Sequence, residues 1–438
     1  MDIYNFISFL GIGMLLFIAW LISEDKRNMN WKVIGWGIFL QLLIAVFIFI
    51  VPVGAKIFMF LNEAVINVLN TASAGAQFVF GKLALAPGQV SDTGEVSPGF
   101  ILAFQAFPAI IFFSAIISVL YFFNIMPVII RFFAGIFTKL MKISGAESLV
   151  AASNIFVGIE SAFTVKPHLD KMTRSEMCTI LTVGMATVAS NVLALYVFSL
   201  REQFPTIAGH LISASLLSAP AALVMSKIVI PEGETPVTAG KYIMPHYEKE
   251  KNLFEAIIKG ANSGVKMIVG IIALLIAVLG LVALVDLFLS AVGNLSNQFL
   301  GLNVDWSLKG ILGYVFYPFT LILGVPVADA GTISGIIAER MIVTEVVAYR
   351  DLAGVMAEGV LTHPRSAVIA AYALCGFAHL ASMAIFAGGI AALAPARTRT
   401  IAETAPVALV AATLACLLTA CVAGTFFVKG SMLLKMSQ

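Results

Sequence analysis

The sequence contains few charged residues, and this scarcity excludes most classes of soluble protein. Only 11% of the 438 residues are Asp, Glu, Lys or Arg, whereas 60% are hydrophobic, and the mean hydropathy is +1.00. A soluble protein of this length carries about a quarter charged residues. The net charge is only +2 and the basic residues form no stripe, so we expect no nucleic-acid partner.

Other absences narrow the possible activities. The four cysteines lie in apolar runs without the spacing of paired metal ligands or of a disulfide framework, and we interpret them as small core residues. Gly-x-x-x-x-Gly-Lys, His-Glu-x-x-His and Ser/His/Asp patterns are missing from the apolar sequence, which argues against ATP hydrolysis and against an enzyme. No filter-like sequence or acidic ring indicates an ion channel, which we keep as a weaker alternative.

Long uncharged runs are what the sequence has instead. A membrane-spanning helix needs roughly 20 mostly apolar residues. Eight runs reach about this length, namely residues 3–23, 33–55, 96–130, 177–200, 203–226, 267–285, 366–396 and 404–428. The sequence therefore predicts an all-α polytopic membrane protein with eight transmembrane helices. Placing the loops of Lys26, Arg131, Lys249 and Arg397 inside puts both termini outside.

Two of these runs carry the same polar residues at the same spacing. Each has Gly-x-x-polar-x-x-Ser, ten or eleven residues after an Arg-Ser pair, and the polar positions are Thr187 and Ser190 in one copy and His379 and Ser382 in the other. A duplicated helix that keeps glycine and hydroxyl residues in apolar sequence indicates a transporter built from two repeats. The binding site of such folds lies where the repeats meet.

An interrupted apolar segment precedes each copy and predicts a re-entrant hairpin, at residues 147–170 and 310–349. Residues 54–83 and 127–143 are predicted interfacial helices. These features divide the chain into four parts. Residues 1–145 are a scaffold part with the first three spans and the interfacial helices, and residues 146–229 are a first transport repeat with the first hairpin and spans four and five. Residues 230–307 are a cytoplasmic loop followed by the sixth span, which also belongs to the scaffold, and residues 308–438 are a second transport repeat with the second hairpin and the last two spans.

Two carboxylates in the hairpins are candidate site residues. Glu160 is the only charged residue between Glu147 and Lys166, and a carboxylate at membrane depth costs about 2.5–3.5 kcal/mol on insertion scales, so it is usually kept for a function. The alternative is an ion pair with Lys166 or Arg174. Glu345 can accept two hydrogen bonds from neighbouring substrate hydroxyls, or it can form a salt bridge that closes the hairpin.

Three neutral residues complete the candidates. Asn154 and Thr187 offer the hard oxygen atoms that suit Na⁺, and a broken helix adds backbone carbonyls; the alternative for a membrane Asn is a bond between helices. His379 lies near the centre of the uncharged run 366–396, where it can donate to a substrate, relay protons or simply pack. Asp329 and Glu339 are expected to organise the second hairpin.

These residues lie in stretches that resemble the concentrative nucleoside transporter family, essentially over the whole chain. The matching stretches are residues 153–158 (Ser-Asn-Ile-Phe-Val-Gly), 165–169 (Val-Lys-Pro-His-Leu), 184–187 (Gly-Met-Ala-Thr), 345–349 (Glu-Val-Val-Ala-Tyr) and 373–378 (Ala-Leu-Cys-Gly-Phe-Ala). The resemblance implies a homotrimer of eight-helix protomers in the plasma (inner) membrane. Each protomer would hold two opposed re-entrant hairpins and carry nucleoside by an elevator-like movement through the lipid.

The resemblance also implies a division of the site. The cation, Na⁺ with H⁺ as the alternative, would bind Asn154, Thr187 and the carbonyls of Val157 and Val188. The ribose would bind Glu345 and Ser382, beside Phe377. The base would contact the tip of the first hairpin, formed by Ile159, Glu160 and Ser161.

Three departures from the family pattern fall in this shell. The tip reads Ile159-Glu160-Ser161 where the family has Gln, then Thr, Ser or Asn, then Glu. His379 stands where the family has Asn. Thr344 stands where the family often has Asn, and we include it among the predicted substrate-binding residues. A buried polar site rejects substrates that lack its hydrogen-bond partners. We therefore expect an altered base preference, for a purine or a modified nucleoside.

Overall fold

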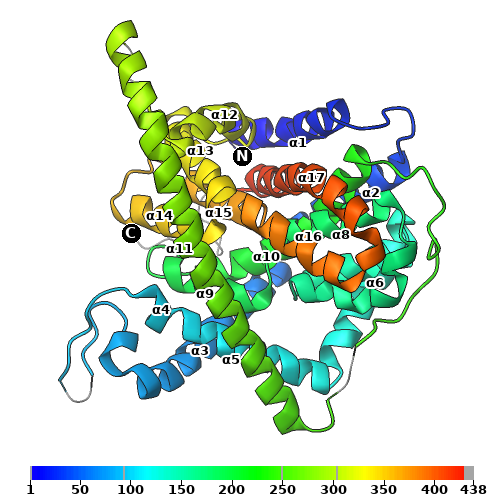
Figure 1. The fold of residues 1–438 in the computed structure, drawn as a ribbon, viewed down its shortest axis with the longest axis horizontal. Helices are drawn as coiled ribbons and strands as arrows, with labels where there is room; N and C mark the ends of the chain where they lie inside the picture. Colours follow the sequence, from blue (N-terminus) through cyan, green and yellow to red (C-terminus); the bar gives the residue numbers. More distant parts are fainter. Residues whose placement is uncertain (1, 92–93, 248–249, 302–303, 429–438) are drawn as a thin grey trace.

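The computed structural model describes residues 2–91, 94–247, 250–301 and 304–428, and every regular element in these ranges is a helix (Figure 1). Lys249 of the predicted inner loops lies outside them. The described residues include eight helices that are long and apolar enough to cross a membrane. This set differs from the predicted one in a single member, because it contains Pro52–Ala84 and lacks the run 366–396, which the structure breaks in two.

The N-terminal third is a series of apolar helices. They are α1 (Ile3–Leu21), α2 (Trp31–Phe49), α3 (Pro52–Phe80), the short α4 (Leu102–Gln105), α5 (Phe107–Phe122) and α6 (Ile125–Met141). The interfacial helices predicted at 54–83 and 127–143 correspond to α3 and α6. Of these, α6 is amphipathic and buries Met126, Ile130, Phe137 and Met141 on one side.

The first repeat contains a hairpin, a broken helix and an intact helix. Its elements are α7 (Gly145–Asn154), the 3₁₀ helix η2 (Ile159–Lys171), α8 (Arg174–Ala186), α9 (Ser190–Leu200) and α10 (Ile207–Val229). The second arm of the hairpin is 3₁₀ and not α; it contains Pro167, which has no backbone N–H to donate. Capping boxes start α7 at Ser144 and α8 at Thr173, and they fix where both helices begin.

The long helix α11 (Leu253–Leu300) separates the two repeats. It runs beside α5 and crosses the whole molecule (Figure 1). In the segment Leu253–Phe299 only 6% of the most apolar window is buried, against 89% in the segment that contains α10. The helix α11 is therefore peripheral, whereas α8, α10 and α17 form the core.

The second repeat has more helices than its sequence pattern indicates. They are α12 (Leu308–Ile322), α13 (Val327–Ile342), α14 (Glu345–Ala357), α15 (Pro364–Leu374), α16 (Leu380–Leu393) and α17 (Thr398–Thr425). The chain reverses twice after α12, once through Gly324, which has φ +80°, and once between α13 and α14. The segment predicted as one hairpin at 310–349 is thus α12, α13 and the start of α14, and the helical pair α13–α14 extends to Ala357.

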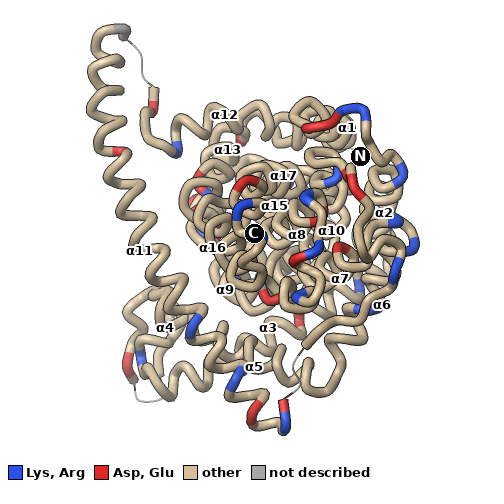
Figure 2. The backbone as a smooth tube through the Cα atoms, turned by 45° about the vertical axis from the view of Figure 1, so that its right-hand side comes forward, with Lys and Arg blue, Asp and Glu red and all other residues tan. Residues whose placement is uncertain are grey.

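Charged residues occupy the ends of helices and the loops, and most of the interior carries none (Figure 2). One buried exception joins the first repeat. The Lys227 ammonium lies 2.6 Å from Glu147 and 3.1 Å from Glu232, which ties α10 to the start of the hairpin. The second repeat is joined by Asp329, which accepts hydrogen bonds from the N–H groups of Thr362 and His363 ahead of α15. Asp329 therefore joins α13 to the start of α15, and its predicted role in organising the hairpin stays a prediction.

Contacts between helices do not follow the predicted four parts throughout. The helix α1 packs against α17, and α2 packs against α10, although the prediction assigns α1 and α2 to the scaffold part. The helix α5 packs against α11, and the prediction assigns both of these helices to the scaffold.

Candidate functional site

The two broken helices meet at the centre of the core. The first break lies between Ala186 and Ser190 and the second between Leu374 and Leu380. Gly376 in the second break has φ +133°, and a Cβ atom there would lie 2.8 Å from the Ala186 carbonyl oxygen. Only glycine permits both this backbone conformation and this approach. The broken ends of the two repeats are therefore in direct contact.

Glu345 is the carboxylate of the second half of this site. It is the first residue of α14, it is 3% exposed, and its Oε2 lies 3.0 Å from Nε2 of His379, which is 2% exposed. Its Oε1 accepts a hydrogen bond of 2.7 Å from the Tyr196 hydroxyl of α9. Within the described chain its ion-pair partner is His379, and neither of the nearby arginines in the sequence, Arg340 and Arg350, forms a salt bridge with it.

The hydrogen bonds of His379 determine its tautomer. Its Nδ1 accepts from the backbone N–H of Ser382 at 3.2 Å, so a neutral ring carries its proton on Nε2. Nε2 is also the ring atom that lies 3.0 Å from the Glu345 carboxylate. The Ser382 hydroxyl contacts the carbonyl oxygens of His379 and of half-buried Phe377. Four predicted substrate residues, Glu345, Phe377, His379 and Ser382, therefore lie together.

Thr344 adjoins this cluster at the turn before α14. It is 4% exposed, and its hydroxyl has no hydrogen-bond partner among the described residues. A buried hydroxyl without a partner is uncommon and costs free energy. Thr344 is therefore free to bind a polar group that reaches the turn.

Asn154 ends α7, and the hydrogen bonds of its amide leave one oxygen unused. Its Nδ2 donates to the Val150 carbonyl at 3.2 Å and to the Ser161 hydroxyl at 2.6 Å. Its Oδ1 is buried and accepts no hydrogen bond from the described residues. Ser161, which the sequence predicts as a substrate residue, thus braces Asn154 across the hairpin.

The other predicted cation ligands lie along the first break. Thr187 caps α8, and its hydroxyl donates to the Val183 carbonyl at 2.9 Å, which leaves oxygen lone pairs free to coordinate a cation. The hairpin tip reaches the same break, because the N–H of Ser190 donates to the Phe156 carbonyl at 3.1 Å. Val157 and Val188 are buried there, so each could offer only its carbonyl.

These groups suit a hard monovalent cation and not a tightly bound divalent metal. No cluster of three or more His, Cys, Asp or Glu side chains capable of holding a metal occurs among the described residues. Neutral amide, hydroxyl and carbonyl oxygens favour an ion such as Na⁺.

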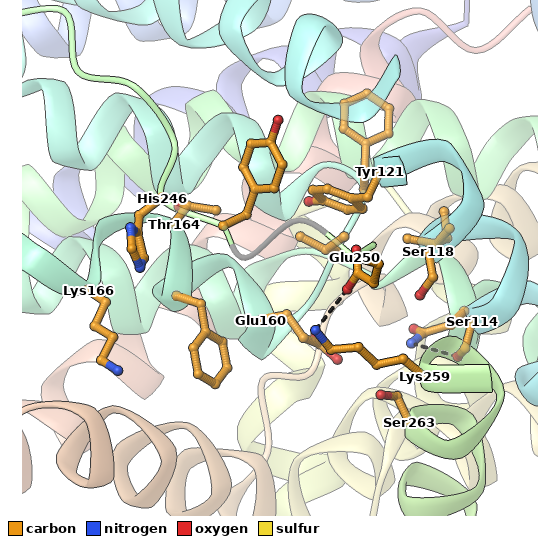
Figure 3. A pocket seen from close by; sticks show the side chains of 16 residues that line it. Ser114, Ser118, Tyr121, Glu160, Thr164, Lys166, His246, Glu250, Lys259 and Ser263 are labelled. Atoms are coloured by element: carbon orange, nitrogen blue, oxygen red, sulfur yellow. Dashed lines mark hydrogen bonds and ion pairs between the residues drawn. The ribbon is translucent and has the colours of Figure 1, made fainter. Parts of the chain in front are cut away.

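Glu160 lies apart from Glu345, in a cavity of about 470 Å³ beside the first hairpin (Figure 3). The cavity is lined by the hairpin and by Asn191 of α9 on one side, and by Ser118, Tyr121 and Ser263 of α5 and α11 on the other. Glu160 is exposed to it. Its alternative partner Arg174 pairs with Glu24 at 2.6 Å instead. The side chain of Ile159 lies outside the described part of the structure.

Tyr196 is the site residue that the sequence analysis missed. It is fully buried in α9, and its ring lies 4.7 Å from that of Tyr349. A buried tyrosine hydroxyl usually has a hydrogen-bond partner, and a tyrosine in an apolar run was therefore the sequence signal that could have identified Tyr196.

Glu339 pairs with Lys309 at 2.6 Å on the outer side of α13, away from the His379 cluster.

Three family descriptions match successive parts of the chain. Na⁺ dependent nucleoside transporter N-terminus matches residues 10–83, Nucleoside recognition (Gate) matches residues 103–203, and Na⁺ dependent nucleoside transporter C-terminus matches residues 210–424.

Similar proteins occur in mammals and in bacteria. Solute carrier family 28 member 3 of Mus musculus is 36% identical over 434 residues, which are 96% of this chain and 58% of that protein. Nucleoside permease NupC of Helicobacter pylori is 34% identical over 423 residues and is covered to 97%. The chain thus spans 58% of the mouse relative and nearly all of the bacterial one.

Solved structures of CNTnw resemble the whole fold. The inward-facing substrate-bound state has a TM-score of 0.85 at 31% identity, and the match covers 97% of this chain and 98% of that one. A substituted CNTnw in an outward-facing state has a TM-score of 0.86 at 30% identity, with the same coverage. Together with the family descriptions and the eight apolar helices, these likenesses show that the chain is a multi-pass membrane protein that belongs to the concentrative nucleoside transporter family, a family of transporters and not of enzymes.

Proposed function

We propose that this protein couples the inward flow of Na⁺ to nucleoside uptake. One observation carries the proposal, namely that two helix breaks meet in an apolar core and hold separate sets of buried polar groups. The first set contains Asn154, whose buried Oδ1 lacks a hydrogen-bond donor. The second contains Glu345 with its partners His379 and Tyr196. A neutral oxygen set suits a monovalent cation, and a carboxylate suits the hydroxyls of a ribose.

Uptake into proteoliposomes tests the coupling ion. With an inward Na⁺ gradient at constant pH, we expect labelled nucleoside to accumulate above equilibrium, and replacing Na⁺ by choline should abolish the accumulation. Accumulation that persists in choline and follows a pH gradient would replace this proposal by H⁺ coupling. The observation that favours this second candidate is the buried, titratable His379–Glu345 pair.

The proposal includes an altered base preference. Glu160 stands in the cavity beside the first hairpin, where the resemblance puts base contacts, and with Ile159 and Ser161 it departs from the family pattern. A carboxylate accepts hydrogen bonds, so it favours a base that presents amino or N–H groups. Uptake competition among adenosine, guanosine, inosine, cytidine and uridine tests this. An ordinary preference for uridine would contradict it.

The proposal extends to assembly and movement. We assign the protein to the plasma (inner) membrane as a homotrimer whose hairpins are re-entrant and whose transport part moves like an elevator. The exposed apolar side chains of α11, such as Ile276 (72% exposed) and Phe288 (64%), suit contact with lipid or with a neighbouring protomer. The boundary between moving and fixed parts stays a prediction. Because α1 packs against α17 and α2 packs against α10, we expect α1 and α2 to move together with α17 and α10. Mass measurement in lipid nanodiscs tests the trimer.

A further inference from the structure

Arg340 is a fully buried cation that the function described so far does not use. It lies in the last turn of α13, is 0% exposed and is the largest fully buried side chain in the described chain. Its Nη1 donates to the Ala373 carbonyl at 3.1 Å, whereas its Nε and Nη2 have no hydrogen-bond partner among the described residues. No carboxylate forms a salt bridge with it in that part of the chain. Burying an unpaired charge is costly, so the surroundings must compensate for it or the function must require it.

The end of a broken helix supplies that compensation. Ala373 is the penultimate residue of α15, where the aligned peptide dipoles leave a partial negative charge. The neighbouring carbonyls converge on the same place, because the Cys416 thiol donates to the Cys375 carbonyl at 3.1 Å and Gly376 touches the Ala186 carbonyl of the other break. Arg340 therefore places its positive charge where the second repeat exposes backbone carbonyl oxygens.

The first repeat has the same kind of helix end at Ala186, and no described lysine or arginine donates a hydrogen bond to the carbonyls of its last turn. The break itself offers the hydroxyl of Thr187, and the hairpin that reaches it through Phe156 offers the Oδ1 of Asn154, which has no hydrogen-bond donor among the described residues. Both side chains are neutral. The two breaks therefore have the same kind of backbone geometry, but they differ in the charge of the side chains beside them. The first presents neutral side-chain oxygen atoms, and the second presents a cation attached to the protein.

We infer that Arg340 is a tethered cation that takes, at the second break, the place that a mobile coupling ion takes at the first. One consequence is that a single cation moves with each nucleoside. The inference rests on the cation site proposed at Asn154, but it does not depend on whether the mobile ion is Na⁺ or H⁺.

The first test measures the unsubstituted protein and needs no variant. Reversal potentials in proteoliposomes give the charge moved per nucleoside, and we expect one positive charge for each uncharged nucleoside. A ratio of two would overturn the inference, because both breaks would then bind mobile ions. An absence of Na⁺ dependence would contradict only the proposed coupling ion, since the ratio is measured equally well with protons.

The second test compares three substitutions of Arg340. Arg340→Lys keeps a tethered cation and should retain uptake with the same cation dependence. Arg340→Met keeps the bulk without the charge, and Arg340→Ala opens a cavity; both should lose about tenfold or more of the uptake. Millimolar guanidinium should restore uptake several-fold in Arg340→Ala, and it should not stimulate the unsubstituted protein.

A merely structural role for Arg340 predicts a different outcome. In that case guanidinium would not restore Arg340→Ala, or Arg340→Met would transport at the original rate with the original cation dependence. Either result would overturn the inference. Size-exclusion profiles and thermal midpoints identify variants that fail to fold, and for these the charge ratio of the unsubstituted protein decides.

Discussion

At the scale of single residues, the Glu345 carboxylate contacts two protein side chains and can still accept hydrogen bonds from a substrate. Tyr196 and His379 each take one of its oxygens, at 2.7 and 3.0 Å. An ionised carboxylate has about four lone-pair positions, so two hydroxyls can bind without displacing either partner. The two side chains therefore fix the orientation of the carboxylate, so that it is preorganised for substrate binding.

We expect Glu345→Gln to lose most nucleoside uptake, because a hydrogen bond to a charged group is worth about 1.5–3 kcal/mol, or at least a tenfold change in KM. Tyr196→Phe keeps the carboxylate and removes one neutral donor, so KM should rise only about fivefold. Initial uptake rates against nucleoside concentration measure both. The matched control is Tyr349→Phe, whose hydroxyl donates to the Ala371 carbonyl. An unchanged KM in Glu345→Gln would refute the assignment.

Asn154 is the corresponding residue for the cation. Asn154→Ala removes the unpartnered Oδ1, and we expect the Na⁺ concentration for half-maximal uptake to rise about tenfold, because one of few protein ligands is lost. Sodium titrations of uptake at saturating nucleoside measure the effect. Ser148→Ala is the control, since it removes a buried hydroxyl from the same helix away from the break. Equal shifts in both variants would argue for a general packing effect.

At the scale of elements, the sequence predicts where apolar helices lie better than where they break. Charge-free runs are a local property, so their positions are readable directly. The break after α15 depends on Gly376, whose backbone can take φ +133° and whose missing Cβ lets Ala186 approach. The need for glycine there arises from a helix of the other repeat, nearly 200 residues away in the chain.

Gly376→Ala tests this contact. The added Cβ would meet the Ala186 carbonyl oxygen at 2.8 Å in a conformation that alanine rarely adopts, so we expect a loss of about 2 kcal/mol or more in stability and a strong loss of uptake. Gly388→Ala in α16 is the matched control, because its Cβ would meet nothing within 4 Å. Thermal unfolding in detergent compares the two. A stable and active Gly376→Ala variant would show that close contact between Gly376 and Ala186 is required neither for stability nor for uptake.

At the scale of the whole molecule, α5 and α11 form a support that differs from the core. With 48 residues and a rise of about 1.5 Å per residue, α11 is about 72 Å long, more than twice the hydrocarbon thickness of roughly 30 Å. It lies beside α5 and is almost unburied, whereas α8, α10 and α17 are enclosed. The cavity of Figure 3 lies between this support and the first hairpin.

A cross-link across that cavity tests whether the two sides move. Ser118→Cys with Thr164→Cys joins α5 to the hairpin, and a bismaleimide should stop uptake while nucleoside binding persists. Ser118→Cys with Ser263→Cys joins α5 to α11 in the same cavity and should leave uptake within about twofold of the untreated rate. The four native cysteines are buried, so they compete little for the reagent. Equal inhibition in both pairs would contradict relative movement.

The sequence by itself determined the class of molecule and the identity of most candidate residues. Apolar run length, basic loops and the paired Gly-x-x-polar-x-x-Ser pattern are local, and they predict membrane helices and a duplicated site without any contact being known. Only the tertiary structure decided the partners. Tyr196 and Glu345 are 149 positions apart, and the Arg340 guanidinium turns to the end of α15 and not to Glu345. Such pairings depend on how helices pack across the core, and no local pattern of residues contains that information.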